Sequence, residues 1–280
     1  VAFPCAQGLF KTKKRDLIPL TLPYLAALIP EGIETRITDE QVQDWDPEAP
    51  CDCVFISVHI LNSFHAYEIA DAYRQRGIPV VMGGPHTTFY GDEVQEHADA
   101  IAVGEGETLV PEILDDLTRG RLKPRYRASD LHDLRGLPFP RHDLLDPSTL
   151  SRYRTVAIQT TRGCPYRCEF CSERYYLGEK YRMRPVDEVI EEIRFGRSRQ
   201  VFFADSTFVG NRSHTMELME RLLPLKIRWS TLWNAHRVLD LEMMELAKKS
   251  GLLHINMGVE SIQPETLKGM HKSTTPADRL

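Results

Sequence analysis

Apolar strand-like runs alternate with amphipathic helical stretches over residues 1–118. The run Val54–Val58 is apolar, and apolar residues recur at helical spacing in Phe64–Arg76 until Gly77 ends the helix. Repeating strand–helix units predict a parallel sheet with helices on both faces, whose ligands lie at the carboxyl ends of the strands. The same pattern predicts strands at Val1–Pro4, Ile78–Met82 and Ala100–Val103, and helices at Leu17–Leu28 and Glu107–Leu117.

A second strand–helix series begins at Thr155–Gln159, after a polar, proline-containing stretch. We therefore place two domains at residues 1–125 and 153–280, joined by an extended linker at 126–152. Four strand–helix units fit in the second domain, so a barrel would be incomplete at its C-terminus. Both ends look cut, as in a fragment of a longer protein. The expected strands are Val201–Ala204, Ile227–Leu232 and Leu253–Val259, and the expected helices are Val186–Arg194, Thr215–Leu223 and Leu241–Lys249.

The composition narrows the class of protein. Of the 280 residues, 42% are hydrophobic and 27% are charged, which suits a globular protein of two domains. The formal net charge of −5 argues against a nucleic-acid surface, which is usually rich in Lys and Arg. No apolar run approaches the roughly 20 residues of a membrane span, and no secretory signal is visible. We expect a cytoplasmic protein.

Three of the six cysteines lie within eight residues, in a loop that follows a strand. Cys164, Cys168 and Cys171 have C-x3-C-x2-C spacing, which lets three thiolates converge on one iron–sulfur cubane. Three ligands leave one iron of a four-iron cluster open to a chelating substrate. The alternative is zinc, which prefers four ligands and would need His214 or His236 from elsewhere in the chain.

The cysteine motif, with the aromatic Phe170 before its last cysteine, resembles the radical S-adenosylmethionine (SAM) superfamily from about Thr155 onward. The resemblance implies an α/β fold, a partial (β/α)6 barrel of TIM type. It also implies a [4Fe–4S] cluster on the loop after the first barrel strand. The methionine amino and carboxylate groups of SAM would chelate the open iron, and one electron would cleave SAM to a 5′-deoxyadenosyl radical.

Further residues of the resemblance follow the later barrel strands. Asp205 and Ser206 stand where such enzymes hold the methionine amino group, although many relatives have two acidic residues there. Arg237 suits the methionine carboxylate, and Glu260 and Ser261 suit the ribose hydroxyls. An ordinary solvated or helix-capping role is the alternative for each, but positions at the carboxyl ends of barrel strands favour function.

The front domain resembles the Rossmann-like, doubly wound cobalamin-binding domain that precedes the radical domain in one large subclass. Glycines let backbone approach a large flat ligand, and a serine at a strand end offers a donor to the nucleotide tail. The alternative is a Rossmann-like interaction domain without a cofactor; a dinucleotide site is disfavoured because no G-x-G-x-x-G follows the first strand. The residues that carry the resemblance are Ser57, Gly83, Gly84, Gly104 and Gly106.

One family feature is missing from the first loop. Residues 4–9 contain no D-x-H-x-x-G, so we expect cobalt without a lower histidine ligand. His59 and His86 are interpreted as polar residues at strand ends. Cys51 and Cys53, just before a strand, could be metal ligands only with distant help and are interpreted as buried or idle thiols.

Together the domains indicate a cobalamin-dependent radical SAM methyltransferase that methylates an unactivated carbon, or phosphorus, through methylcobalamin. A small-molecule or peptide substrate and an external one-electron reductant of the flavodoxin or ferredoxin type are implied. A cobalamin-associated radical oxidative cyclase or ring-remodelling enzyme is the alternative within enzymes. A cobalamin or iron–sulfur redox sensor is the alternative outside them, although the open iron argues against it.

Overall fold

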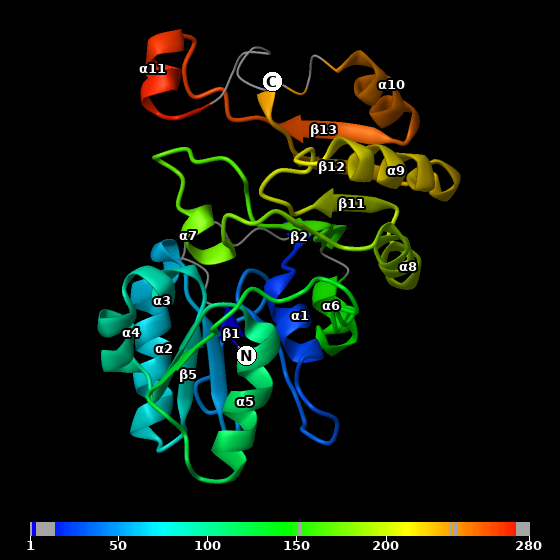
Figure 1. The fold of residues 1–280 in the computed structure, drawn as a ribbon. Coiled ribbons are helices and arrows are strands. Elements are labelled where there is room, and N and C mark those ends of the chain that lie inside the picture. The colour runs from blue at the N-terminus through cyan, green and yellow to red at the C-terminus, as the bar shows by residue number, and fades with distance from the viewer. Residues whose placement is uncertain (1, 4–14, 151–152, 236, 238–239, 273–280) are drawn as a thin grey trace. The chain divides into compact units, whose positions relative to one another are not determined.

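The structure is a computed structural model that describes residues 2–3, 15–150, 153–235, 237 and 240–272 (Figure 1). The chain divides into two compact units. The first unit comprises residues 1–132 and 138–154, and the second comprises residues 133–137 and 155–280. Each unit is built on a parallel sheet and is described by itself.

In the described residues, the sheet of the first unit has six strands in the order β3-β1-β4-β5-β6-β7, and every neighbouring pair is parallel. This confirms the predicted parallel sheet. Its strands are β1 (Ala2–Phe3), β3 (Thr38–Asp39), β4 (Val54–Ser57), β5 (Val80–Gly83), β6 (Ala100–Val103) and β7 (Arg125–Arg127).

Helices cover both faces of this sheet (Figure 1). Successive strand residues point to opposite faces, so Met82 packs in one core with Ile69 of α2, while Val81 packs in another with Ile113 of α5. Burying each such side chain contributes about 1.5–3 kcal/mol. The helices are α1 (Thr21–Ala27), α2 (Ser63–Gln75), α3 (Pro85–Phe89), α4 (Gly91–His97) and α5 (Gly106–Thr118), with a 3-10 turn, η1 (Ile60–Asn62).

The helix predicted at Leu17–Leu28 is shorter in the structure. A strand, β2 (Arg15–Ile18), occupies its first residues, and α1 begins only at Thr21. Pro19 explains the difference, because a proline disfavours helical backbone at the residue before it. Apolar residues at helical spacing begin before this proline. Periodicity alone therefore predicted a helix start that is too early.

The segment predicted as an extended linker, 126–152, differs from that expectation. It holds the end of β7, a 3-10 turn η2 (His142–Leu144) and a short helix α6 (Pro147–Leu150). The backbone N–H of Arg141 donates to the carbonyl of Pro23 at 2.9 Å, and Leu145 is buried. Apolar side chains between the polar residues therefore fold residues 138–154 into the first unit.

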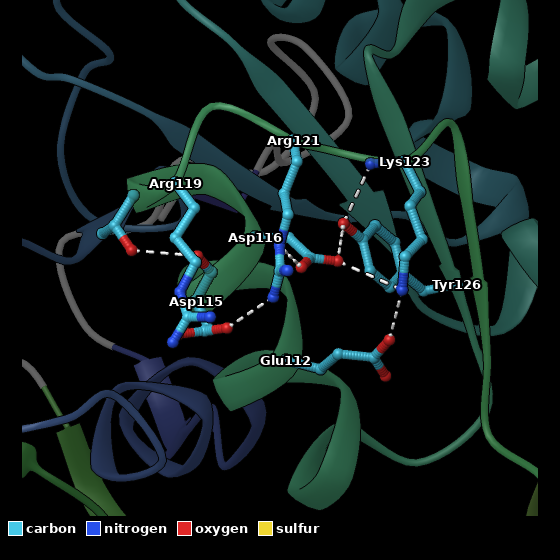
Figure 2. Close-up of polar contacts among 8 residues, drawn as sticks. Glu112, Asp115, Asp116, Arg119, Arg121, Lys123 and Tyr126 are labelled. Atoms are coloured by element: carbon cyan, nitrogen blue, oxygen red, sulfur yellow. Dashed lines mark hydrogen bonds and ion pairs between the residues drawn. The ribbon is translucent and has the colours of Figure 1, made fainter.

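An ion network joins the end of α5 to the edge strand β7 (Figure 2). The buried carboxylate of Asp116 accepts from Arg121 Nε at 2.7 Å and from the hydroxyl of Tyr126 at 3.0 Å. Lys123 Nζ lies 3.1 Å from the same carboxylate and 2.8 Å from Glu112. These contacts fix the connection that positions β7 beside β6.

The second unit contains four parallel strands in the order β13-β12-β11-β8, in agreement with the predicted series of strand–helix units. Its core includes the stacked rings of Phe203 and Phe208, 5.1 Å apart, beside Trp229. The strands are β8 (Tyr153–Ile158), β11 (Gln200–Phe203), β12 (Arg228–Leu232) and β13 (Leu252–Asn256), with an antiparallel pair, β9 (Thr161–Arg162) and β10 (Arg182–Met183). The helices are α7 (Glu173–Leu177), α8 (Val186–Gly196), α9 (Arg212–Leu222), α10 (Leu241–Lys249) and α11 (Pro264–Gly269), with a 3-10 turn η3 (Leu223–Leu225).

None of the helices in the described ranges combines the length and the apolar character that crossing a lipid bilayer requires.

Candidate functional site

The three cysteines of the C-x3-C-x2-C motif all line one pocket in the second unit. Their loop leaves the β9–β10 pair at Gly163, whose φ of +84° and close approach to the carbonyl of Lys180 exclude a side chain. The backbone N–H of Cys164 donates to Gly178 at 3.3 Å, and that of Cys171 donates to Cys168 at 3.1 Å. The loop is thus folded back so that all three thiols reach the same space.

The rest of the pocket comes from the carboxyl ends of the neighbouring strands. β11 contributes Ser206 from the loop that follows it, and β12 and β13 contribute Asn234 and Asn256 at their ends. Parallel strands end at one edge of a sheet, which explains why residues distant in sequence meet here. The other lining residues are Tyr166, Phe170, Glu173, Leu232, Trp233, Ala235, Gly258, Glu260 and Lys272.

The electrostatics of the thiols favour their protonated form when no metal is present. Burial raises the pKa of Cys164 to about 11, and the neighbouring thiols Cys171 and Cys168 add to it. Burial also raises the pKa of Cys168, although the ammonium of Lys272 opposes it. Within the described residues, no three His, Cys, Asp or Glu side chains already stand as a metal-binding group. Metal binding would have to displace these protons and draw the thiols together.

The donor set fits an iron–sulfur cluster better than zinc. Three thiolates are the donors that such clusters prefer, whereas structural zinc sites have four ligands. His214, considered as a fourth zinc ligand, does not line the pocket, and its Nε2 bonds the carbonyl of Arg184 at 2.8 Å. His236, the other candidate, lies outside the described residues.

Asp205 and Ser206 have different surroundings. The carboxylate of Asp205 is 1% exposed and accepts from the backbone N–H groups of Thr160 at 2.7 Å and Thr161 at 2.9 Å. The hydroxyl of Thr160 also donates to it. Asp205 is not among the lining residues, whereas Ser206 is. In this geometry Asp205 fixes the chain after β8, and its contact with SAM stays a prediction.

The remaining predicted SAM residues are only partly brought together. Glu260 lines the pocket with left-handed backbone, φ +60°, and its carboxylate lies 2.9 Å from Lys272 Nζ. Ser261 is outside the lining and accepts from the N–H of Gln263 at 3.0 Å. Arg237 is also outside it, and its buried Nε has no hydrogen-bond partner within the described part of the chain. The pocket therefore unites Phe170, Ser206 and Glu260 with the cysteines.

The sequence pattern did not identify several polar residues of the pocket, among them Asn234, Asn256 and Lys272. Asn234 follows β12 and Asn256 ends β13, so their position at strand ends was a usable signal. Lys272 had no such signal, because it follows α11 and reaches the pocket only through tertiary packing.

In the first unit, unpaired buried polar atoms gather after β4 and β5. The hydroxyls of Ser57 and Thr87 and Nδ1 of His86 are buried, with no hydrogen-bond partner among the residues that the structure describes. At Gly84, φ is +102°, and an added Cβ would lie 2.8 Å from the carbonyl of Val58. Leaving such groups unpaired is costly, so these strand ends suit a polar ligand, whereas the close backbone of Val58 accounts for Gly84.

The other predicted cobalamin glycines also lie close to atoms of the chain itself. An added Cβ at Gly104 would meet Ala128 at 2.7 Å, and one at Gly106 would meet Leu25 at 2.7 Å. Packing within the chain thus accounts for both. Gly83 leaves ordinary room for a Cβ, 3.5 Å from the carbonyl of Ala102. Their contact with cobalamin stays a prediction.

His59 and His86, which we expected to be polar residues at strand ends, lie shortly after the ends of β4 and β5. Nε2 of His86 lies 3.0 Å from the hydroxyl of Tyr67. Burial lowers the pKa of His59, and His86 lowers it further. Burial raises the pKa of Cys53 to about 12, which suits an idle thiol. The first loop, residues 4–9 with Cys5, lies outside the described residues.

Two family models match the two parts of the chain. The B12 binding domain matches residues 7–114, and the Radical SAM superfamily matches residues 158–280. The bacteriochlorophyllide d C-12(1)-methyltransferase of Chlorobaculum tepidum is 31% identical over 92% of this chain and 59% of its own length. The anaerobic magnesium-protoporphyrin IX monomethyl ester cyclase of Rubrivivax gelatinosus is 26% identical over 90% of this chain and 51% of its own.

A solved structure has the same fold. The cobalamin-dependent SAM radical enzyme OxsB, solved with aqua-cobalamin and SAM bound, matches with a TM-score of 0.80 and 20% identity, covering 98% of this chain and 45% of that one. The chain thus spans less than two thirds of the length of each of these three proteins. From its two matched domains and its cysteine motif, the chain belongs to the radical SAM superfamily, with a B12-binding domain in front of the radical SAM domain.

Proposed function

We propose that this protein is a cobalamin-dependent radical SAM methyltransferase acting on a small molecule. The observation that carries the proposal is the convergence of Cys164, Cys168 and Cys171 on one pocket at the strand ends of the radical SAM domain. The B12-binding domain and a relative named as a methyltransferase support the methyl-transfer part.

In the second unit, the three cysteines would hold a [4Fe–4S] cluster, and Ser206, Phe170 and Glu260 would surround SAM. When bound, such a cluster supplies the electron that cleaves SAM to a 5′-deoxyadenosyl radical, and an external one-electron reductant of the flavodoxin or ferredoxin type would replace that electron. The aromatic face of Phe170 gives the pocket an apolar wall, and the Glu260 carboxylate offers acceptors to ribose hydroxyls. The polar strand ends would orient SAM.

In the first unit, Ser57, His86 and Thr87 present buried polar atoms that a cobalamin tail would satisfy. When bound, cobalamin supplies a methyl group that can pass to a carbon radical. These three residues would position the cofactor and take no part in the chemistry.

The products of SAM test the proposal. Anaerobically purified, reconstituted protein with reductant and candidate substrates should yield 5′-deoxyadenosine together with S-adenosylhomocysteine, and Cys168→Ala should yield no 5′-deoxyadenosine. The substrate panel would begin with tetrapyrroles, on which the named methyltransferase and cyclase act. Production of 5′-deoxyadenosine without any S-adenosylhomocysteine would refute methyl transfer.

An oxidative cyclase would give 5′-deoxyadenosine without S-adenosylhomocysteine. The similarity to a magnesium-protoporphyrin IX monomethyl ester cyclase keeps this second candidate. A sensor would bind the cofactors without cleaving SAM, so the absence of both products would favour it.

A further inference from the structure

Lys272 joins three segments of the second unit at the edge of the cysteine pocket. Its Nζ lies 2.9 Å from Glu260 Oε1 and 5.5 Å from the centre of the Phe170 ring. The side chain of Lys272 is only 16% exposed, and that of Glu260 is 34% exposed. The pair is therefore partly shielded from water, which strengthens it relative to a surface ion pair.

The backbone around Lys272 is held against the cysteine loop. The N–H of Glu169 donates to the carbonyl of Met270 at 3.1 Å, and its carboxylate lies 2.9 Å from His271 Nδ1. The N–H of Lys272 donates to Leu267 in α11 at 2.9 Å. These contacts place the end of α11 beside the loop that carries the cysteines.

Glu260 needs such support. Its left-handed backbone is uncommon for a residue with a side chain, and such a residue persists where its surroundings determine it. An added Cβ at Gly258 would lie 2.3 Å from Glu260 Oε1 and 3.0 Å from Lys272 Nζ. The glycine thus leaves the space in which the carboxylate and the ammonium meet.

We propose that Lys272 is a positioning residue of the SAM pocket. Through its ion pair with Glu260 and its position over the Phe170 ring, it holds the Glu260 carboxylate beside the cysteine loop. There the carboxylate can accept hydrogen bonds from the ribose hydroxyls of SAM. This inference rests on the proposed function, because it assigns the pocket to SAM. Lys272 acts through Glu260 and does not take part in the radical chemistry.

The test measures the dissociation constant of SAM by equilibrium dialysis with anaerobically reconstituted protein. Lys272→Met should bind SAM about fivefold more weakly than wild type, the ratio that corresponds to losing a partly shielded ion pair. Lys272→Arg should restore most of the affinity. Lys249→Met, at an exposed lysine 4.0 Å from Glu245 on α10, is the matched control and should bind like wild type.

A double-mutant cycle separates positioning from a general structural effect. In a Glu260→Gln background, Lys272→Met should cause little further loss of affinity, because the two residues act as one unit. Iron content and the unfolding midpoint should match wild type. If Lys272→Met folds poorly, Gly258→Ala displaces the same two side chains by a methyl group and should weaken SAM binding similarly.

Unchanged affinity in Lys272→Met, or equal losses with and without Glu260, would overturn the positioning role while leaving the proposed function intact. Wild-type protein that binds no SAM would refute the proposed function, and this inference with it.

Discussion

The carboxylate of Asp205, at the end of β11, accepts a hydrogen bond from the backbone N–H of Thr160 at 2.7 Å, just after β8. The next N–H, from Thr161, donates to the same oxygen at 2.9 Å. One buried side chain thereby fixes the start of the chain that leads into the cysteine loop. The position of the cysteines depends on this contact as well as on their own spacing.

Substituting Asp205 should therefore disturb both stability and the cysteine loop. Asp205→Asn replaces one acceptor by an amide donor that faces backbone N–H or hydroxyl groups, which should lower the free energy of unfolding by about 1–3 kcal/mol. Iron retention after reconstitution should fall as well. Asp187→Asn, at a carboxylate 73% exposed, is the control. Unchanged iron content and stability in Asp205→Asn would contradict this role.

Breaking the ion pair between Arg184 and Glu192 should strongly destabilise the folded second unit. Arg184 Nη1 contacts Glu192 Oε2, and the two side chains are 3% and 6% exposed. Glu192→Gln leaves the guanidinium buried without its counter-charge, so the free energy of unfolding should fall by about 3 kcal/mol. Chemical denaturation measures this. The neighbouring, exposed Glu191→Gln should have little effect, and equal stabilities of the two variants would count against the pair.

His65 should make the stability of the first unit depend on pH. Burial lowers the pKa of His65, but hydrogen bonds to Glu40 and Glu68 outweigh it and hold the pKa above the ordinary value of 6.5. The raised pKa means that protonated His65 stabilises the fold below the ordinary value, and that this contribution is lost as the pH rises through the folded-state pKa.

Unfolding at about pH 6 and about pH 8 measures the effect, since His titrates in this range. Wild type should lose more stability than His65→Gln between these two pH values. The same pH dependence in both proteins would show that His65 has no such linkage.

The two groups of cysteines should differ sharply in their effect on iron content. Cys164→Ala, Cys168→Ala and Cys171→Ala should each lose most of the bound iron, because each removes one of three thiolates from the pocket. Cys51→Ala and Cys53→Ala should retain it, since those thiols lie in the first unit, where burial keeps Cys53 protonated. Iron analysis after reconstitution decides this, and a motif variant with full iron content would disprove the ligand assignment.

Much of the fold could be predicted from the sequence because it depends on local periodicity. The strand at Ala100–Val103 and the helix at Leu241–Lys249 have the predicted bounds, since apolar spacing and a following glycine mark them clearly. The predicted start of the first helix at Leu17 was wrong, because Pro19 restricts the backbone of the residue before it and hydrophobic periodicity carries no such information.

The residues of the site also differ in whether local sequence spacing could predict them. The cysteines and Phe170 lie in one short motif, so their spacing in the sequence was enough to predict that they line one pocket. Lys272 reaches the pocket through the turn after α11, and the use of Asp205 as an acceptor for Thr160 depends on the pairing of β8 with β11. Such tertiary relationships have no signature at the level of residue spacing.

The cofactor content of anaerobically purified, reconstituted protein tests the central claim most directly. We predict about four irons with matching sulfide and one corrin per chain, with the iron lost when Cys164, Cys168 and Cys171 are replaced together by alanine. Zinc in place of iron, or iron that persists in the triple variant, would contradict the cluster. Absence of a corrin from protein reconstituted with cobalamin would contradict the role of the first unit.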